Sequence, residues 1–157
     1  MVVEHEYPLA PKDLFAVLID PQYLAARHER FGGTGSPEVV QDGSAVQLRI
    51  ARQLPMDKIP SAARALVGDG QLVQVDDWDT SAVPLRGEWH AEVDHAPVVL
   101  RGANEIAASD LGSRYSIGVE VTVKVPLIGR QLEGQVRGYL ETLVTKEQEY
   151  LAQWIAE

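Results

Sequence analysis

One segment near the C-terminal end changes its hydrophobic period at a single proline. Over residues 114–125 apolar and polar residues alternate, which is typical of a strand with one buried face. Beyond Pro126 apolar residues return every third or fourth position, namely Leu132, Val136, Tyr139, Leu140, Leu143, Tyr150, Leu151 and Trp154. A helix over 128–155 would be about 40 Å long. We therefore predict that this helix lies across the apolar face of a sheet.

The rest of the chain predicts short strands and a few short helices. Strands are expected at 2–7, 37–40, 45–54, 71–78, 85–93 and 98–108, and Asp42-Gly43 is a strong hairpin signal. Two short helices follow the first strand, the second capped by Asp20 before Pro21, and a helical turn is expected within 59–66. The fold class is thus α+β, with a curved antiparallel sheet of six or seven strands and one long C-terminal helix.

Composition narrows the range of partners. The chain has 14 basic and 23 acidic residues and a formal charge of -9, which repels nucleic acid and anionic bilayers. There is no cysteine, so disulfides and thiolate metal sites are excluded. No signal peptide and no transmembrane run is recognisable, which predicts a cytoplasmic protein with no integral membrane association. With no linker-like tract, residues 1–157 are expected to form one domain.

Three stretches carry a resemblance to a known family: HEYPLAPKDLFAVLIDPQYLAAR, LPMDKIPSAARALVGDG, and VKVPLIGRQLE with the tail EQEYLAQWI. Together they resemble domain-of-unknown-function family 2505, a bacterial branch of the START-like (SRPBCC) superfamily, which includes lipid-transfer domains, plant allergens and polyketide cyclases. The resemblance implies a helix-grip fold, in which the sheet grips the long helix around a cavity for an apolar or amphipathic small molecule. It implies no particular reaction and supplies no catalytic motif.

Small residues on the predicted inner face also favour a cavity. Gly87, Ala91, Gly102 and Ala108 lie at inward positions where bulk is missing. The alternative is that neighbouring side chains fill these gaps, because protein interiors are densely packed.

Three polar residues are predicted to face this interior. Arg52 shares a face with apolar residues, so it either meets a carboxylate, reaches water at a rim, or holds an acidic head group. His5 is either an acid or base or a hydrogen-bonded structural histidine. Asn104 is either a satisfied core amide or a substrate contact. The apolar and aromatic walls of the predicted site are Leu48, Trp89, Tyr115, Ile117, Val119, Leu132, Val136 and Tyr139.

Other polar clusters are expected to be structural. His90 and His95 point to opposite faces of a strand, so no metal site is predicted, and no cofactor is expected. Asp76, Asp77 and Asp79 are expected at a solvated strand end, and the glycine-rich stretch 31–35 is expected to be a turn.

The sequence favours a non-enzymatic binder or carrier of a small hydrophobic or amphipathic molecule. The alternative is a polyketide cyclase or dehydratase that uses the same cavity, which requires at least two inward titratable groups near one point. A third possibility is an interaction module or homodimer. Its only support is a line of small residues on the last helix, namely Gly134, Gly138, Thr145 and Ala152.

Overall fold

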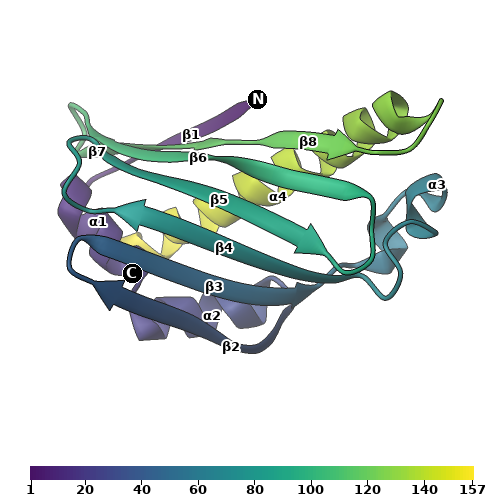
Figure 1. Cartoon of the computed structure of the whole chain (residues 1–157). Helices are drawn as coiled ribbons and strands as arrows, with labels where there is room; N and C mark the ends of the chain where they lie inside the picture. Colours follow the sequence, from purple (N-terminus) through teal and green to yellow (C-terminus); the bar gives the residue numbers. More distant parts are fainter.

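A computed structural model describes residues 1–157 and contains one curved antiparallel sheet with a long helix against one face (Figure 1). The strands follow the order β1-β7-β6-β5-β4-β3-β2, and β8 also pairs with β6. Their bounds are β1 Val2–Tyr7, β2 Gly33–Asp42, β3 Ala45–Gln53, β4 Gln71–Asp79, β5 Leu85–Val93, β6 Val98–Ala108, β7 Ser113–Gly118 and β8 Glu120–Val123. The α+β class and the helix-grip arrangement are confirmed.

The predicted strand at 114–125 is in fact two strands. Both β7 and β8 pair with β6 in one register, and the ladder is interrupted at Gly118. The Gly118 carbonyl accepts a hydrogen bond from the Trp89 indole Nε1 at 2.9 Å. A side chain at Gly102 would collide with this carbonyl, so the two backbones can approach only because residue 102 is glycine. The sheet therefore has eight strands, one more than the upper expectation.

The helices cover the inner face from both ends (Figure 1). Helices α1 (Pro11–Leu18) and α2 (Pro21–Arg30) follow β1, and the Asp20 carboxylate accepts the Gln22 N–H at 2.7 Å as the predicted cap. A short 3-10 turn η1 (Met56–Lys58) and α3 (Ser61–Arg64) join β3 to β4. Helix α4 (Gly129–Ala156) crosses the sheet, with its C-terminal end near α1 and α2.

Two apolar clusters pack α4 against the sheet. One surrounds the N-terminal half of α4 and includes Leu132 and Val121, whereas the other surrounds the C-terminal half and includes Tyr7, Trp78 and Leu151. None of the helices is long and apolar enough to cross a membrane.

Several local expectations are corrected. The glycine-rich stretch is not only a turn, because β2 begins at Gly33. Ala108 is exposed, so it contributes nothing to a cavity. Gly87 and Gly102 leave no empty space, because the rings of Trp78 and Trp89 lie over them. The missing bulk at these glycines is therefore filled by neighbouring tryptophans.

Candidate functional site

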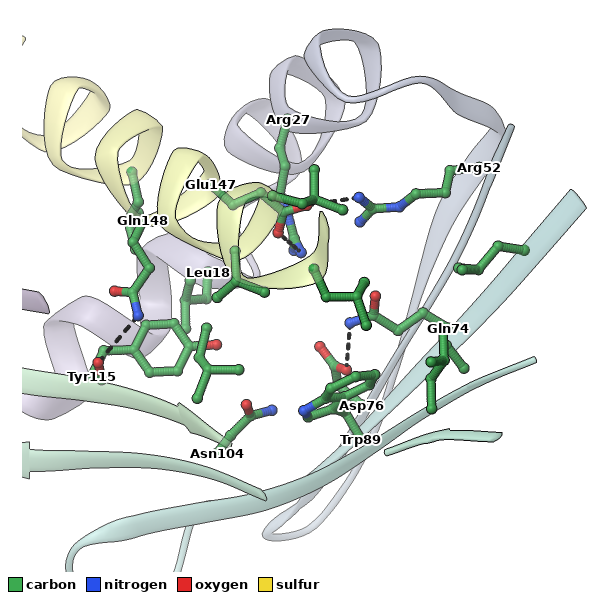
Figure 2. Close-up of a pocket in the computed structure, with 18 of the residues that line it drawn as sticks. Leu18, Arg27, Arg52, Gln74, Asp76, Trp89, Asn104, Tyr115, Glu147 and Gln148 are labelled. Atoms are coloured by element: carbon green, nitrogen blue, oxygen red, sulfur yellow. Dashed lines mark hydrogen bonds and ion pairs between the residues drawn. The ribbon is translucent and has the colours of Figure 1, made fainter. Parts of the chain in front are cut away.

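A cavity of about 70 Å³ lies between the sheet and α4 (Figure 2). Thirteen of its 20 lining residues are hydrophobic. The polar remainder consists of Arg27, Arg52, Gln74, Asp76, Asn104, Glu147 and Gln148. Since a water molecule needs roughly 10–15 Å³ of such space, the cavity holds a few waters or a small chemical group.

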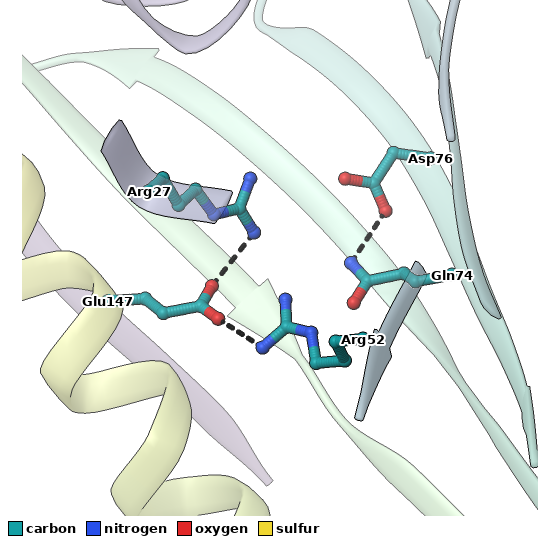
Figure 3. A network of polar contacts seen from close by, with 5 residues as sticks. All are labelled: Arg27, Arg52, Gln74, Asp76 and Glu147. Atoms are coloured by element: carbon teal, nitrogen blue, oxygen red, sulfur yellow. Dashed lines mark hydrogen bonds and ion pairs between the residues drawn. The ribbon is translucent and has the colours of Figure 1, made fainter. Parts of the chain in front are cut away.

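Three charged residues from three elements meet at the helix side of the cavity (Figure 3). Arg27 of α2 donates to Glu147 Oε2 at 2.8 Å, and Arg52 of β3 donates to Glu147 Oε1 at 2.7 Å. The three side chains are 13%, 7% and 14% exposed, respectively. Burial alone would raise the pKa of Glu147, but the two guanidinium groups outweigh burial and lower it to about 2. Arg52 has therefore met a carboxylate, the first of the three expected outcomes.

Local sequence explains how these charges reach the interior. Arg27 lies three and four residues after Leu24 and Tyr23, on the buried stripe of α2. Glu147 lies seven residues after Leu140 and four before Leu151, on the buried stripe of α4. A charged residue within an apolar stripe indicates a buried charge. The prediction for Arg52 rests on this signal. Arg27 and Glu147 carry the same signal but were not predicted to face the interior.

Asp76 is also buried, which corrects the expectation of a solvated strand end. Only 6% of it is exposed, because it alternates with Leu72 and Trp78 on the inner face of β4. Its Oδ1 accepts a hydrogen bond from Gln74 Nε2 at 3.0 Å, and it forms no ion pair. Burial raises its pKa, and the hydrogen bond from Gln74 opposes this rise only in part. Asp77 and Asp79 are exposed as expected.

Two further polar groups point into the cavity without a protein partner (Figure 2). Asn104 is 3% exposed, and its side-chain amide makes no hydrogen bond with the protein. Tyr115 is 8% exposed, and its hydroxyl likewise makes none. Burial, and then the negative charge of Asp76, raise the pKa of Tyr115 well above its ordinary value. Asn104 is thus not the satisfied core amide that was the structural alternative.

Gln148, next to Glu147, has both ends of its side-chain amide hydrogen-bonded within the protein. Its Oε1 accepts from the Tyr7 hydroxyl at 2.7 Å, and its Nε2 donates to the carbonyls of Val3 and Tyr115 at 3.2 and 3.3 Å. These bonds fasten α4 to β1 and β7. Burial raises the pKa of Tyr7, and the nearby Tyr23 adds to this rise, so the hydroxyl remains a donor.

Five of the eleven predicted site residues line the cavity, namely Arg52, Trp89, Asn104, Tyr115 and Ile117. They come from β3, β5, β6 and β7, whose side chains converge on one face of the sheet. Trp89 is held by its bond to Gly118, so it forms a fixed wall. Whether these five contact a ligand remains a prediction.

The structure places the other six outside the cavity. Leu48 packs with Leu24 and Ile50 beneath α2. Val119 and Leu132 are buried in the apolar cluster around the N-terminal half of α4, and Val136 packs against that cluster. Two polar residues are also displaced: His5 is half-buried on the edge strand β1 with Nδ1 2.8 Å from the Glu6 carbonyl oxygen, and Tyr139 faces an outer groove. Leu48, Val119 and Leu132 are buried as predicted, but none of the three lines the cavity.

No group of three or more His, Asp or Glu side chains is placed to hold a metal ion. His90 lies on the exposed face of β5, and His95 lies in the following turn.

The profile of a family described as "Protein of unknown function (DUF2505)" matches residues 2–155. The chain belongs to the DUF2505 family. No curated protein matches this DUF2505 chain significantly.

Solved structures share the fold of this DUF2505 protein at low sequence identity. The crystal structure of TTHA0849 from Thermus thermophilus is 15% identical with a TM-score of 0.64, and the match covers 100% of this chain and 99% of that one. The Zhui aromatase/cyclase from a Streptomyces species, R1128, is 14% identical with a TM-score of 0.60, over 99% and 93% of the two chains. A conserved protein from Geobacillus kaustophilus is 16% identical with a TM-score of 0.54, over 97% and 93%.

Proposed function

We propose that the protein binds a small amphipathic molecule between the sheet and α4, as a binder or carrier. The observation that supports this most directly is the pair of groups without a protein partner, the Asn104 amide and the Tyr115 hydroxyl, which face a cavity with a mostly hydrophobic lining. Buried polar groups nearly always have a hydrogen-bond partner, which is either a protein group or an ordered water. A ligand with a hydrogen-bonding end would supply that partner, and its apolar part would contact the leucine-rich wall.

The size of the cavity sets a condition on this function. Ligand pockets usually measure about 300–1,000 Å³, so a space of about 70 Å³ must widen to admit a whole ligand. Leu143 and Val144 of α4 are half-buried and line the cavity, so in this proposal they are the side chains that move aside to admit the ligand. Burial of apolar ligand surface contributes about 25 cal/mol per Å² towards this opening.

The likeness to the Zhui aromatase/cyclase supports a placement in the START-like superfamily, and the resemblance to that superfamily implies a ligand cavity between the sheet and the long helix. We extend that use to this chain, acting as one helix-grip domain on a small hydrophobic or amphipathic partner. The role requires neither nucleic acid nor a cofactor.

The test combines native mass spectrometry with a thermal-shift screen of fatty acids, sterols and aromatic polyketides. We expect a bound species that is lost on denaturation, or at least one compound that raises the melting temperature. Asn104→Leu fills the cavity and removes the amide, so it should abolish the shift. Gln135→Leu, an exposed amide on α4, is the matched control. If no species is retained and no compound produces a shift, the proposal fails.

A cyclase-like enzyme is the second candidate, favoured by Asp76. Asp76 is a buried carboxyl with a raised pKa in the same cavity as Tyr115 and Asn104. A carboxyl whose pKa is raised can deliver a proton, while an amide and a hydroxyl stabilise a developing oxyanion. Incubation with poly-β-keto thioester analogues and product analysis tests this candidate. Turnover that Asp76→Asn abolishes, with binding retained, would establish an enzyme, whereas unchanged substrate would leave the binder.

A further inference from the structure

A second, larger hollow lies outside the cavity and shares a wall with it. This outer groove of about 590 Å³ lies between α4, the C-terminal end of α2, and the segment from the end of β3 through η1. Arg52 and Leu143 line both the outer groove and the cavity. Arg52 and Leu143 therefore form the wall between the cavity and the outer groove.

The charge of the outer groove is opposite to that of the chain. Four basic residues line it, namely Arg30, Arg52, Lys58 and Lys146, and Glu149 is its one acidic lining residue. The chain as a whole has a charge of -9, so a positive groove is a local exception. Asp57 lies near Tyr139, whose pKa it helps to raise, but it does not line the groove.

Three of these four cations form no ion pair, and the fourth, Arg52, pairs with Glu147. Arg30, Lys58 and Lys146 take part in none of the ion pairs of the protein, and Arg30 lies only over the Phe31 ring, at 5.9 Å from its centroid. Arg52 uses one of its five N–H groups, in the bond to Glu147. The outer groove thus presents unused donors and positive charge beside the entrance to an apolar interior.

We propose that the outer groove binds the anionic head group of the ligand, a carboxylate or a phosphate monoester, while the apolar part passes Leu143 into the cavity. This inference rests on the proposed function and names the class of its ligand. Tyr139 and Tyr150 line the same groove and are half-buried, so they give its floor an apolar surface next to the cations. An uncharged or cationic amphiphile would gain nothing from this arrangement.

The experiment uses three probes with the same ten-carbon chain: decanoate, decyl phosphate and decanol. Each is titrated calorimetrically into the whole protein below its micelle concentration, at low salt and again at high salt. We expect the anionic probes to bind about fivefold to tenfold more tightly than decanol at low salt. The advantage should shrink at high salt, because salt screens exposed charges. The two anions distinguish a carboxylate ligand from a phosphate ligand.

Two double variants locate the effect. Lys58→Gln with Lys146→Gln should remove most of the anionic advantage and leave decanol binding unchanged. Lys12→Gln with Lys124→Gln makes the same change in net charge at exposed lysines elsewhere, and it should change neither. All four lysines are exposed, so both proteins should fold.

The outcomes separate this inference from the proposed function. Equal binding of decanol and the anions overturns the anionic head group but leaves the amphiphile site intact. An equal loss in both double variants assigns the effect to net charge and overturns the outer groove. If none of the three probes binds, the proposed function fails and this inference fails with it.

Discussion

Glu147 and Gln148 are neighbours on α4, both bonded across the interior, yet they belong to different kinds of polar cluster. Around Gln148, the Tyr7 hydroxyl and the backbone carbonyls of Val3 and Tyr115 use both ends of the amide. Around Glu147, two guanidinium groups share one carboxylate, and most of their N–H groups are left over. Both ends of the Gln148 amide are thus hydrogen-bonded. The two arginines around Glu147 instead keep unused N–H donors on the cavity side, so we call the Gln148 cluster saturated and the Glu147 cluster unsaturated.

This difference separates a structural role from a functional one. A saturated buried network positions elements and gains nothing from a ligand. An unsaturated one costs stability until another molecule completes it. The unpartnered groups of Asn104 and Tyr115 extend the unsaturated set across the cavity, and Gln148 lines the same cavity beside Tyr115 (Figure 2).

Replacing Glu147 by leucine should have the largest effect. Arg27 and Arg52 would lose their shared carboxylate while remaining buried, and breaking a buried pair in this way costs about 3–5 kcal/mol. Urea denaturation at pH 7 measures the free energy of unfolding. Glu141→Leu, an exposed glutamate on the same helix, should change it by less than about 0.5 kcal/mol. Similar stabilities of the two variants would show that the arginines need no partner, and the contrast with Gln148 would disappear.

The contribution of Glu147 should also depend on pH. Its pKa falls from an ordinary 4.5 to about 2 on folding, so the native state binds this proton more weakly than the unfolded state. The stabilisation is therefore complete above pH 4.5 and is lost as the pH falls towards 2, a change of about 3 kcal/mol. Comparing wild type with Glu147→Gln between pH 7 and pH 2 should show a gap that closes in acid. A gap that stays constant would rule out this linkage.

Replacing Gln148 by leucine should cost somewhat less, about 2–3 kcal/mol, because the Tyr7 hydroxyl and two backbone carbonyls lose their partners in the interior. Unlike the Glu147 effect, this loss should be the same at pH 7 and pH 3, since no charge is involved. Urea denaturation at both values checks it, with Gln153→Leu on the exposed side of α4 as control. A ligand affinity that drops as much as stability does would place Gln148 within the functional set.

The sequence predicts the strands better than it predicts the partners of the buried charged residues. The strands β1, β5 and β6 were predicted to the residue, because alternation is a local property. The carboxylate partner of Arg52 was not identified, because Glu147 is 95 residues away and the bond depends on how α4 crosses the sheet. Asp76 was within reach of sequence reasoning: its alternation with Leu72 and Trp78 marks an inward position, but two exposed aspartates beside it concealed the pattern.

The smallest predicted effect has the opposite sign. Burial raises the pKa of Asp76, so the native state binds its proton more tightly than the unfolded state, and stability falls as the pH rises through that pKa. Asp76→Asn removes this cost and should be more stable than wild type at pH 8, by about 1 kcal/mol, with no gain at pH 3. Urea denaturation at both values measures this, and Asp77→Asn, on the exposed face of the same strand, should show no such gain. A residue that destabilises the native protein and is nevertheless placed in the cavity fits a functional group better than a structural one. If Asp76→Asn is instead less stable at pH 8, the carboxylate is a satisfied structural group and does not belong with Asn104, Tyr115 and the spare donors of the two arginines.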